Sequence, residues 1–230
     1  MHIMEGFLPG PWWQIWYVIS LPFIIVGLHQ LNRLVKTQRD TLPALAVAGA
    51  FVFVLSSLKL PSVTGSCSHP TGTGLSAILF GPCIAAVLGL IVLIYQALFL
   101  AHGGITTLGA NVFSMGIAGP AAAYLIYRAG TRAGVNTYAT VFLAAAAANI
   151  VTYIVTSVQL ALAFPGTAGF LGAFQAFAAI FAITQVPLAI VEGAVIALVF
   201  KYIVTLKPDI LTKLNLLSES AIERLREAAA

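Results

Sequence analysis

The chain has 230 residues, of which 60% are hydrophobic and only 8% are charged, and its formal net charge is +4. Because an ordinary soluble domain carries roughly 25% charged residues, this composition excludes a water-soluble globule and predicts an all-α integral membrane protein. The modest positive charge indicates no nucleic-acid partner, since the basic residues lie at the ends of apolar stretches.

The first ten residues, MHIMEGFLPG, precede the apolar stretches. They lack the basic start and the small-residue cleavage site of a signal peptide, and Glu5 and Pro9 interrupt them. Removal of an initiator methionine generally requires a small second residue, and His2 is bulky. We therefore expect Met1 to be retained, with a free α-amine beside His2.

Apolar stretches separated by Gly, Pro and charged residues predict the membrane spans. The first begins with PWW, whose tryptophans suit a membrane interface. The expected spans, in chain order, lie near 12–32, 42–59, 72–101, 109–128, 138–163 and 172–204. The stretch 72–101 is long enough for two segments, and FGPC at 80–83 divides it into a short helix and a full span from about Ile84.

The distribution of basic residues decides how often 72–101 crosses the membrane, because cytoplasmic loops collect Lys and Arg. Basic residues follow the first span, the 109–128 span and the last span; they are Arg33, Lys36, Arg39, Arg128, Arg132, Lys201, Lys207 and Lys213. All three groups fall on one side only if 72–101 crosses twice. We therefore expect seven transmembrane helices, with the N-terminus outside, the C-terminus cytoplasmic, and the short helix wrapped by its neighbours.

The expected organisation is a single transmembrane domain over 1–205, followed by a soluble amphipathic C-terminal tail over 206–230. In this tail, SESAIERLRE is typical of a capped helix, which we expect on the cytoplasmic surface.

Three of the four histidines fall on the outer side in this topology. His2, His69 and His102 lie there, whereas His29 lies near the inner end of the first span. The α-amine of Met1, the amide nitrogen of His2 and its Nδ1 can close two fused chelate rings around one divalent metal. Amide deprotonation requires an ion that binds nitrogen strongly, as copper, nickel and cobalt do. One planar position stays vacant, and His69, in a loop rich in Gly, Ser and Thr, is the best candidate to fill it.

Four nitrogens in a plane suit nickel(II) and can accept cobalt(II), whereas magnesium and calcium prefer oxygen ligands. The pattern thus predicts a metal-binding function for the domain over 1–205.

The other metal-binding side chains have simpler interpretations. We interpret His102, which precedes two glycines, as a helix C-terminal cap or an interface residue, and His29 as interfacial. Cys67 is a possible soft ligand, but Cys83 is too deep to join it, and packing of small residues is preferred for both. Glu5 either hydrogen-bonds the Nε2–H of His2 or is a solvated carboxylate.

Four segments together resemble one family: MHIMEGFLP, VLSSLKLPSVTGSCSHPTGTGLSAILFGP, AHGGITTLGAN and TSVQLALAFP. They are similar to segments of the CbiM/NikM proteins, the substrate-binding membrane (S) components of energy-coupling-factor (ECF) transporters for cobalt and nickel. The resemblance extends from Met1 to about Tyr202. It implies a bundle of six helices with an added N-terminal helix, which agrees with the seven expected from the charges.

The resemblance also implies the ligands and the cargo. The family's metal is held by the N-terminal amine, the backbone nitrogen and side chain of the second residue, and a loop histidine, which correspond here to Met1, His2 and His69. SCSHPTGTG is more similar to the cobalt branch, so Co²⁺ for cobalamin biosynthesis is slightly favoured over Ni²⁺. The metal is the transported substrate, and no cofactor is expected.

The partners implied by the resemblance are a transmembrane (T) component similar to CbiQ or NikQ, ATPase subunits similar to CbiO or NikO, and a small accessory membrane subunit similar to CbiN or NikN. The chain has no Walker A sequence, so ATP must be hydrolysed by partners. The expected location is the plasma membrane of a bacterium or an archaeon, as a multi-pass protein.

Polar groups are rare within the expected spans. Glu192 is a costly intramembrane carboxylate, for which we prefer a structural hydrogen-bonding role facing a neighbouring helix. The candidates for the surroundings of the metal, or for its pocket, are Glu5, Ser66, Ser68, Thr71, Asn111 and Gln159.

The second span carries small residues at four-residue spacing, with one pair formed by Ala44 and Ala48 and another by Ala46 and Ala50. Small residues at this spacing allow two helices to approach closely in lipid. In the family, a similar alanine face docks against the T component. Internal packing is an equally good interpretation.

Two other functions are weighed against transport. An intramembrane metalloenzyme, such as a zinc peptidase, needs HExxH or a similar cluster and an open coordination position; no glutamate stands at helical spacing from a histidine inside a span. A metal channel needs acidic rings along its pore, and only Glu192 is available. The expected function is a metal-capturing transporter subunit that is not an enzyme, with the metalloenzyme as the alternative.

Overall fold

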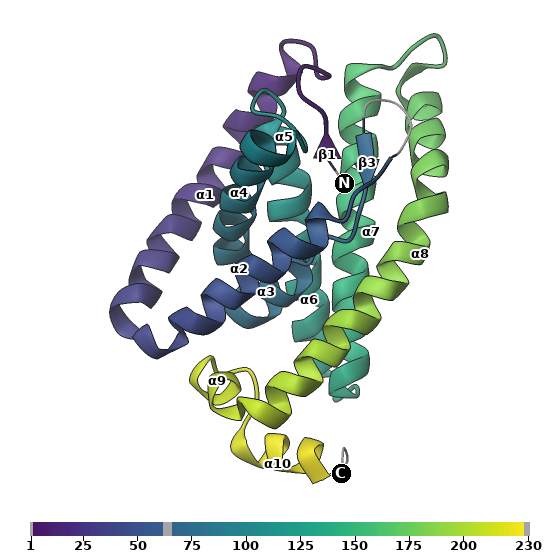
Figure 1. Cartoon of the computed structure of the whole chain (residues 1–230). Coiled ribbons are helices and arrows are strands. Elements are labelled where there is room, and N and C mark those ends of the chain that lie inside the picture. Colours follow the sequence, from purple (N-terminus) through teal and green to yellow (C-terminus); the bar gives the residue numbers. More distant parts are fainter. Residues whose placement is uncertain (1, 62–65, 228–230) are drawn as a thin grey trace.

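Most of the described chain is helical (Figure 1), because in lipid a helix pairs the backbone polar groups within the segment itself. The computed structural model describes residues 2–61 and 66–227. The elements in chain order are β1 (His2–Ile3), α1 (Trp12–Thr37), the 3-10 turn η1 (Arg39–Thr41), α2 (Leu42–Ser57), β2 (Leu60–Pro61), β3 (Ser66–Ser68), α3 (Thr73–Phe80), α4 (Pro82–Leu100), α5 (Leu108–Asn111), the π-helical segment η2 (Val112–Ala118), α6 (Gly119–Arg132), α7 (Thr137–Ala163), α8 (Gly169–Leu206), α9 (Pro208–Lys213) and α10 (Glu219–Glu227).

Among the described residues, six helical segments are long and apolar enough to cross a membrane, and α5, η2 and α6 together form one of them. This finding confirms an all-α, multi-pass membrane protein. The seventh expected crossing corresponds to α3, which has eight residues. A helix of this length rises only about 12 Å, against a hydrocarbon core of about 30 Å. The α3 helix cannot cross alone, so the count of seven stays a prediction.

The short α3 helix lies inside the bundle, and every one of its residues is buried. It packs against α2, α4, α6 and α7. Gly74 permits the close approach to α7, since a Cβ at this position would lie 2.9 Å from the Cα of Ala145. Gly81 ends α3 with a φ of +85°, and Pro82 begins α4. The FGPC sequence therefore divides two helices, as predicted.

The helices α1, α6 and α8, which the three basic groups follow or end, all finish at the end of the bundle that carries α9 and α10 (Figure 1). Lys213 of α9 forms an ion pair with Asp40 of η1, with a distance of 3.2 Å between Nζ and Oδ2. Arg128 and Arg132, at the end of α6, line a cavity together with Asn215, which follows α9. The three basic groups thus share one end, as the charge pattern predicts, and their orientation relative to the membrane stays a prediction.

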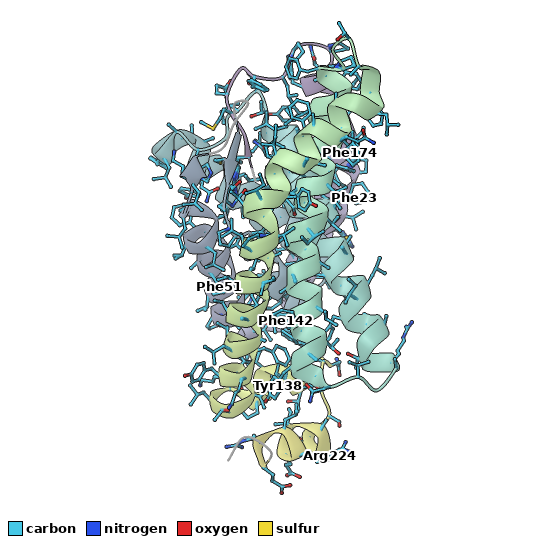
Figure 2. The ribbon with its side chains drawn as sticks, turned by 90° about the vertical axis from the view of Figure 1, so that its right-hand side faces the viewer. Phe23, Phe51, Tyr138, Phe142, Phe174 and Arg224 are labelled. Atoms are coloured by element: carbon cyan, nitrogen blue, oxygen red, sulfur yellow. The ribbon has the colours of Figure 1, made fainter. Side chains whose placement is uncertain are left out.

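The two longest helices, α7 and α8, pack side by side (Figure 2). Phe174 lies towards one end of this pair, and Arg224 of the C-terminal tail lies beyond the other. The tail folds back on the bundle, because Leu211 of α9 and Ile222 of α10 are buried in the main apolar core. The amphipathic pattern of residues 206–230 is explained by this packing, and the division at 205 stays a prediction.

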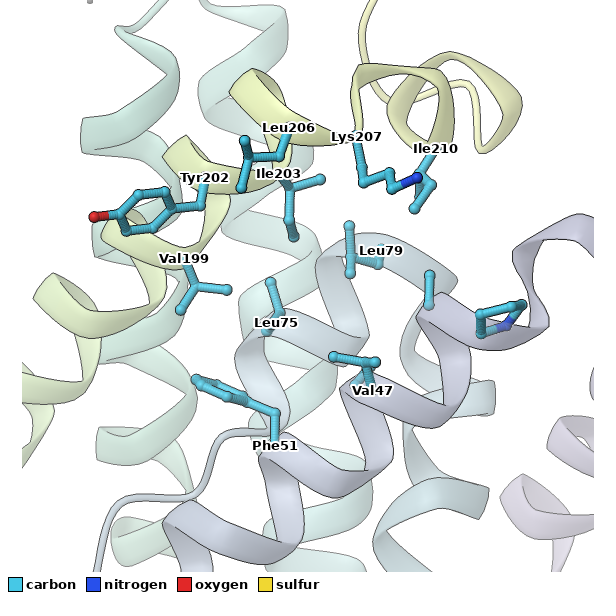
Figure 3. Close-up of a pocket in the computed structure, with 13 residues that line it drawn as sticks. Val47, Phe51, Leu75, Leu79, Val199, Tyr202, Ile203, Leu206, Lys207 and Ile210 are labelled. Atoms are coloured by element: carbon cyan, nitrogen blue, oxygen red, sulfur yellow. The ribbon is translucent and has the colours of Figure 1, made fainter.

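A groove of about 370 Å³ runs between α2, α3 and α8 near the end that carries the tail. Figure 3 shows its apolar walls, with Val47 and Phe51 on α2 opposite Val199 and Tyr202 on α8. The two alanine pairs of α2 differ in whether they line this groove. Ala44 and Ala48 line it and are half-buried and buried, whereas Ala46 and Ala50 are exposed.

Candidate metal centre

A three-stranded sheet brings the N-terminal residues into the bundle. The central strand is β3, and both β1 and β2 pair with it in antiparallel orientation. The register sets His2 opposite Cys67 and Ile3 opposite Ser66. Directly opposite residues project from the same face of a sheet, so the side chains of His2 and Cys67 are neighbours. Met1 lies outside the described residues, and Ser66 is described only through its backbone pairing.

The other edge of β1 is held by side chains rather than by a strand. The backbone N–H of Ile3 donates to Oδ1 of Asn111 at 2.7 Å, and Nδ2 of Asn111 donates to the carbonyl of Ile3 at 3.0 Å. Oγ1 of Thr107 donates to the same carbonyl at 2.8 Å. Nε2 of Gln159, from α7, donates to the carbonyl of Ala110 beside this clamp at 3.0 Å. Residues near a chain terminus are usually poorly ordered, whereas these bonds fix the backbone of Ile3.

Four metal-binding side chains meet beside the clamped strand. His2, Cys67, His69 and His102 each offer one ligand atom, and these atoms all lie within 4.8 Å of one another. Nδ1 of His2 lies 2.5 Å from Nε2 of His69, and Sγ of Cys67 lies 2.9 Å from Nε2 of His102. All four residues are buried, with at most 4% of their surface exposed. Histidine and cysteine in this proximity form a candidate metal centre.

The backbone prepares His69 as a ligand. Its Nδ1 donates to the carbonyl of Pro70 at 2.7 Å. A neutral imidazole that carries its proton on Nδ1 has its lone pair on Nε2, the atom that faces His2. Adjacent ligands of a square-planar ion with bonds of about 2.0 Å lie about 2.8 Å apart. The 2.5 Å separation of the two nitrogens is therefore close to that of two adjacent corners.

Burial keeps the imidazoles neutral. Desolvation lowers the pKa of His2 and of His69 well below the ordinary value, and the neighbouring imidazoles act in the same direction. The pKa of His102 is lowered to about 3, mainly by burial. Burial also raises the pKa of the Cys67 thiol. Near neutral pH the three rings are uncharged, so protons compete little with a metal for their nitrogens.

Gln96 is a site residue that the sequence analysis missed. Its Oε1 and the Nε2 of His2 are both buried, and neither atom has a hydrogen-bond partner among the described residues. The Gln96 side chain raises the pKa of His2, against the effect of burial. An oxygen acceptor beside the second nitrogen is the usual support of a metal-binding histidine. Nε2 of Gln96 donates to Oγ of Ser56 at 2.7 Å, which orients the amide oxygen. The sequence offered one signal for this role: Gln96 stands one turn before the end of a span, close to the AHGG segment.

The interpretation of His102 as a cap or an interface residue is only half right. Its backbone N–H does donate to the carbonyl of Gln96 at 3.1 Å, past the end of α4. Its imidazole, however, is buried against His2, with ring centroids 4.2 Å apart. The glycines that follow are needed for close packing. A Cβ on Gly103, which has a φ of +76°, would lie 3.1 Å from Cδ2 of His2, and a Cβ on Gly104 would overlap Glu5.

Cys67 also differs from its sequence interpretation. It is not only a small packing residue, because its thiol faces His102 inside the cluster. Cys83 lies at the start of α4 and is not a member of the cluster.

Glu5 and Ser68 fasten the surroundings instead of contacting the ligands. Glu5 does not hydrogen-bond His2; its exposed carboxylate accepts from the backbone N–H of Thr106 at 3.1 Å and so joins the N-terminal segment to the loop after α4. Oγ of Ser68 lies 2.7 Å from Oγ1 of Thr184 on α8.

Glu192 binds the loop that follows His69. Its Oε2 accepts from the backbone N–H of Thr71 and from Nδ2 of Asn149, both at 2.7 Å. Its Oε1 accepts from Oγ1 of Thr71 and from the backbone N–H of Gly72, both at 2.6 Å. This carboxylate ties the start of α3, and with it the His69 loop, to α7 and α8. Its role is hydrogen bonding, and its main partner is a loop rather than a helix.

Comparison with known proteins gives concordant matches. The model of the CbiM family, described as the cobalt uptake substrate-specific transmembrane region, matches residues 2–210. A putative cobalt transport protein CbiM 2 of Methanosarcina barkeri is 63% identical over 231 residues, covering 98% of this chain and 98% of the relative. A putative fused cobalt transport protein CbiMQ of Methanocorpusculum labreanum is 54% identical over 225 residues, covering 95% of this chain and 37% of that protein. Among solved structures, a transition metal transporter superposes with a TM-score of 0.77 at 26% identity, over 88% of this chain and 92% of that one.

Proposed function

Because this chain belongs to the CbiM family of cobalt transport proteins, we propose that it is the substrate-binding subunit of an ECF-type importer that captures Co²⁺ or Ni²⁺. The family and its relatives are transporters and not enzymes, so the alternative of a metalloenzyme is not favoured. Co²⁺ follows from the family as the transported substrate. Ni²⁺ as a second cargo, and a supply of cobalt for cobalamin synthesis, belong to the proposal.

The observation that carries the proposal is the 2.5 Å separation between Nδ1 of His2 and Nε2 of His69 inside a buried cluster. We infer a planar site in which these two nitrogens join the amine of Met1 and the amide nitrogen of His2. The clamp on Ile3 supports this ligand set, because it holds the backbone next to the proposed amide ligand. Nitrogen-only, planar ligation is what nickel(II) and cobalt(II) accept and what calcium and magnesium do not.

Capture of the ion requires a defined movement of protons. In the metal-free chain, Nδ1–H of His2 donates to Nε2 of His69, since the single proton of the neutral His69 ring is donated to Pro70. Coordination needs a lone pair on Nδ1 of His2, so this ring must carry its proton on Nε2 instead, next to the unpaired Oε1 of Gln96. The amide proton of His2 leaves the site. Binding therefore releases at least one proton, and affinity rises with pH.

The proposed topology has the histidine cluster on the outer side and the basic end in the cytoplasm. The extended segment with β3 and the buried α3 would together make the seventh crossing. This arrangement puts Arg33, Arg128 and Lys213 on the cytoplasmic side, which follows the positive-inside rule. It corresponds to a multi-pass protein of the plasma membrane.

The partners follow from the same assignment. The fused CbiMQ relative supports a T component similar to CbiQ, while ATPase subunits similar to CbiO and an accessory subunit similar to CbiN are proposed from the resemblance alone. The exposed pair Ala46 and Ala50 is the part of the alanine face that a T component can reach, because Ala44 and Ala48 pack inward.

The test compares metal binding by the full chain with a free N-terminal amine, by the chain acetylated at that amine, by His69→Ala and by His29→Ala, using calorimetric titration with Co²⁺ and Ni²⁺. Acetylation removes the amine from the chelate, and His69→Ala removes the fourth nitrogen, so each should abolish tight binding. His29→Ala is the matched control, because His29 is exposed on α1, and it should bind as the unmodified chain does. Tight binding by the acetylated chain would refute the proposed ligand set.

A further inference from the structure

The cluster contains more donors than the planar site uses. We propose that the same centre has a second coordination mode, in which Cys67 and His102 join His2 and His69 to hold a thiophilic ion such as Zn²⁺ or Cd²⁺ through one sulfur and three nitrogens. This mode rests on the proposed function, because both modes use the same nitrogens of His2 and His69. It differs from the planar mode in needing no contribution from the N-terminal amine.

The geometry supports a four-coordinate site. One donor atom of each of the four side chains lies within 4.8 Å of the other three. In a tetrahedral zinc site with usual bond lengths, two nitrogens lie about 3.3 Å apart, and a nitrogen and a sulfur about 3.6 Å apart. The closest pairs are 2.5 Å and 2.9 Å apart, so no separation has to change by more than about 1.5 Å. Rotations of the imidazoles and of the thiol supply movements of this size.

The preference of the ion for one mode follows from its chemistry. The planar mode requires loss of an amide proton, which only ions that bind nitrogen strongly can enforce. Zn²⁺ and Cd²⁺ have filled d shells and no electronic preference for a plane, and they bind thiolate readily. A set of one cysteine and three histidines therefore suits them better. Four protein ligands leave no position for water, so this mode would hold the ion and not activate it.

The protons balance in this mode. In the metal-free chain the Cys67 thiol can donate to Nε2 of His102, which then carries its own proton on Nδ1. Nε2 of His102 and Nε2 of His69 thus already present lone pairs, and His2 changes tautomer as in the planar mode. When Zn²⁺ or Cd²⁺ binds, the thiol proton is released to solvent and a metal–thiolate bond forms. No oxidant or reductant is involved.

The consequence for transport is competition. Both modes need Nδ1 of His2 and Nε2 of His69, so one chain cannot hold a planar ion and a thiophilic ion together. A thiophilic ion in the cluster therefore excludes the cargo from the site.

The experiment titrates the full-length chain with Cd²⁺ and with Ni²⁺, and follows Cd²⁺ through the ultraviolet charge-transfer band of a cadmium–thiolate bond. Loss of a partner outside the coordination sphere costs 10- to 100-fold in metal affinity, so loss of a direct ligand should cost at least about 100-fold. Cys67→Ser should remove the band and weaken Cd²⁺ binding by at least this factor, and His102→Gln should weaken it similarly. Cys83→Ser, outside the cluster, is the control for thiol loss and should keep the band.

The same variants should weaken Ni²⁺ binding far less than they weaken Cd²⁺ binding, because the planar mode takes no bond from Cys67 or His102. Equal weakening of both ions in Cys67→Ser and His102→Gln would overturn the second mode, because these side chains would then serve the cargo or the fold. A cadmium–thiolate band that survives Cys67→Ser would overturn it as well.

The chain acetylated at its N-terminal amine separates the second mode from the proposed function without touching the cluster. It should lose Ni²⁺ and keep the cadmium band. If it keeps both ions, the planar site is wrong and the second mode stands. If it loses both, the amine is needed for Cd²⁺ and the second mode is overturned.

Discussion

The clamp on Ile3 predicts that metal affinity depends on Asn111, whose side chain, among the described residues, hydrogen-bonds Ile3 and Thr107 and no ligand atom of the cluster. Asn111→Leu keeps a similar side-chain volume but removes both hydrogen bonds to Ile3. The Ile3 carbonyl retains its bond from Thr107, whereas the buried Ile3 N–H loses the acceptor that Asn111 provides. Two hydrogen bonds at about 1 kcal/mol each, and a further 1 kcal/mol or so for the unpaired donor, amount to about 3 kcal/mol. Because docking of β1 must precede binding, this cost reduces the affinity for Co²⁺ or Ni²⁺ by about 100-fold.

Calorimetric titration of the purified chain measures this loss. The metal-free melting temperature should change by only a few degrees, because β1 is a short local element and the bundle persists without it. Gln185→Leu is the matched control: Gln185 is an equally buried amide, it lies on α8, and among the described residues it makes no hydrogen bond to β1. An affinity of Asn111→Leu within about threefold of the unmodified chain would refute the reasoning, as would an equal loss in Gln185→Leu.

Three further predictions concern the loops and the imidazoles. Glu192→Ala removes the acceptor of four hydrogen bonds and should lower the free energy of unfolding by about 3 kcal/mol or more. Glu192→Gln should have a smaller effect. Equal melting temperatures for the two variants would contradict this role of Glu192. Gly104→Ala should lower metal affinity by at least about tenfold, because the added Cβ would overlap Glu5. In Gly10→Ala the added Cβ would have its nearest atom at 3.6 Å, so this variant should bind metal normally. Similar titrations for the two variants would be evidence against the packing argument. Burial lowers the pKa of His102 from an ordinary 6.5 to about 3 in the folded chain, so the contribution of this ring to stability is complete above about pH 6.5 and is lost as pH falls towards 3. Denaturant unfolding of the metal-free chain should therefore lose about 2 kcal/mol per buried imidazole between pH 6.5 and pH 5, and a flat profile would contradict neutral, buried rings.

The helices were predictable because the sequence features that produce them lie within short segments of the chain. Hydropathy, together with the Gly, Pro and charged residues between apolar stretches, indicated a first span from residue 12, a break at FGPC and a final long span. In the structure α1 begins at Trp12, the break lies at Gly81 and α8 ends at Leu206. The common end of the basic groups was also predictable, since membrane crossings alternate in direction. The length of α3 relative to the membrane was harder to predict, because α3 is surrounded by protein and not by lipid.

The centre was only partly predictable. His2 and His69 were identified by the chemistry of an N-terminal chelate, which is readable from two residues and a loop. Gln96 was missed, and Cys67 and His102 were considered but given a packing role and a capping or interface role, because each has an ordinary explanation when it is considered next to its own neighbours in the chain. Their common location arises from contacts between segments that lie far apart in the sequence.

The amino-acid sequence by itself determined that the chain lies in lipid, where its approximate spans are, which family it resembles and which two histidines are candidate metal ligands. These properties depend on composition and on short-range chemistry. Only the tertiary structure decided which donors share one cluster and what holds the N-terminus among them. The strand register brings His2 to Cys67, Asn111 completes the edge of β1, and Glu192 fixes the loop after His69. These are hydrogen bonds between residues up to 121 positions apart, and such bonds are specified by how the helices pack in space.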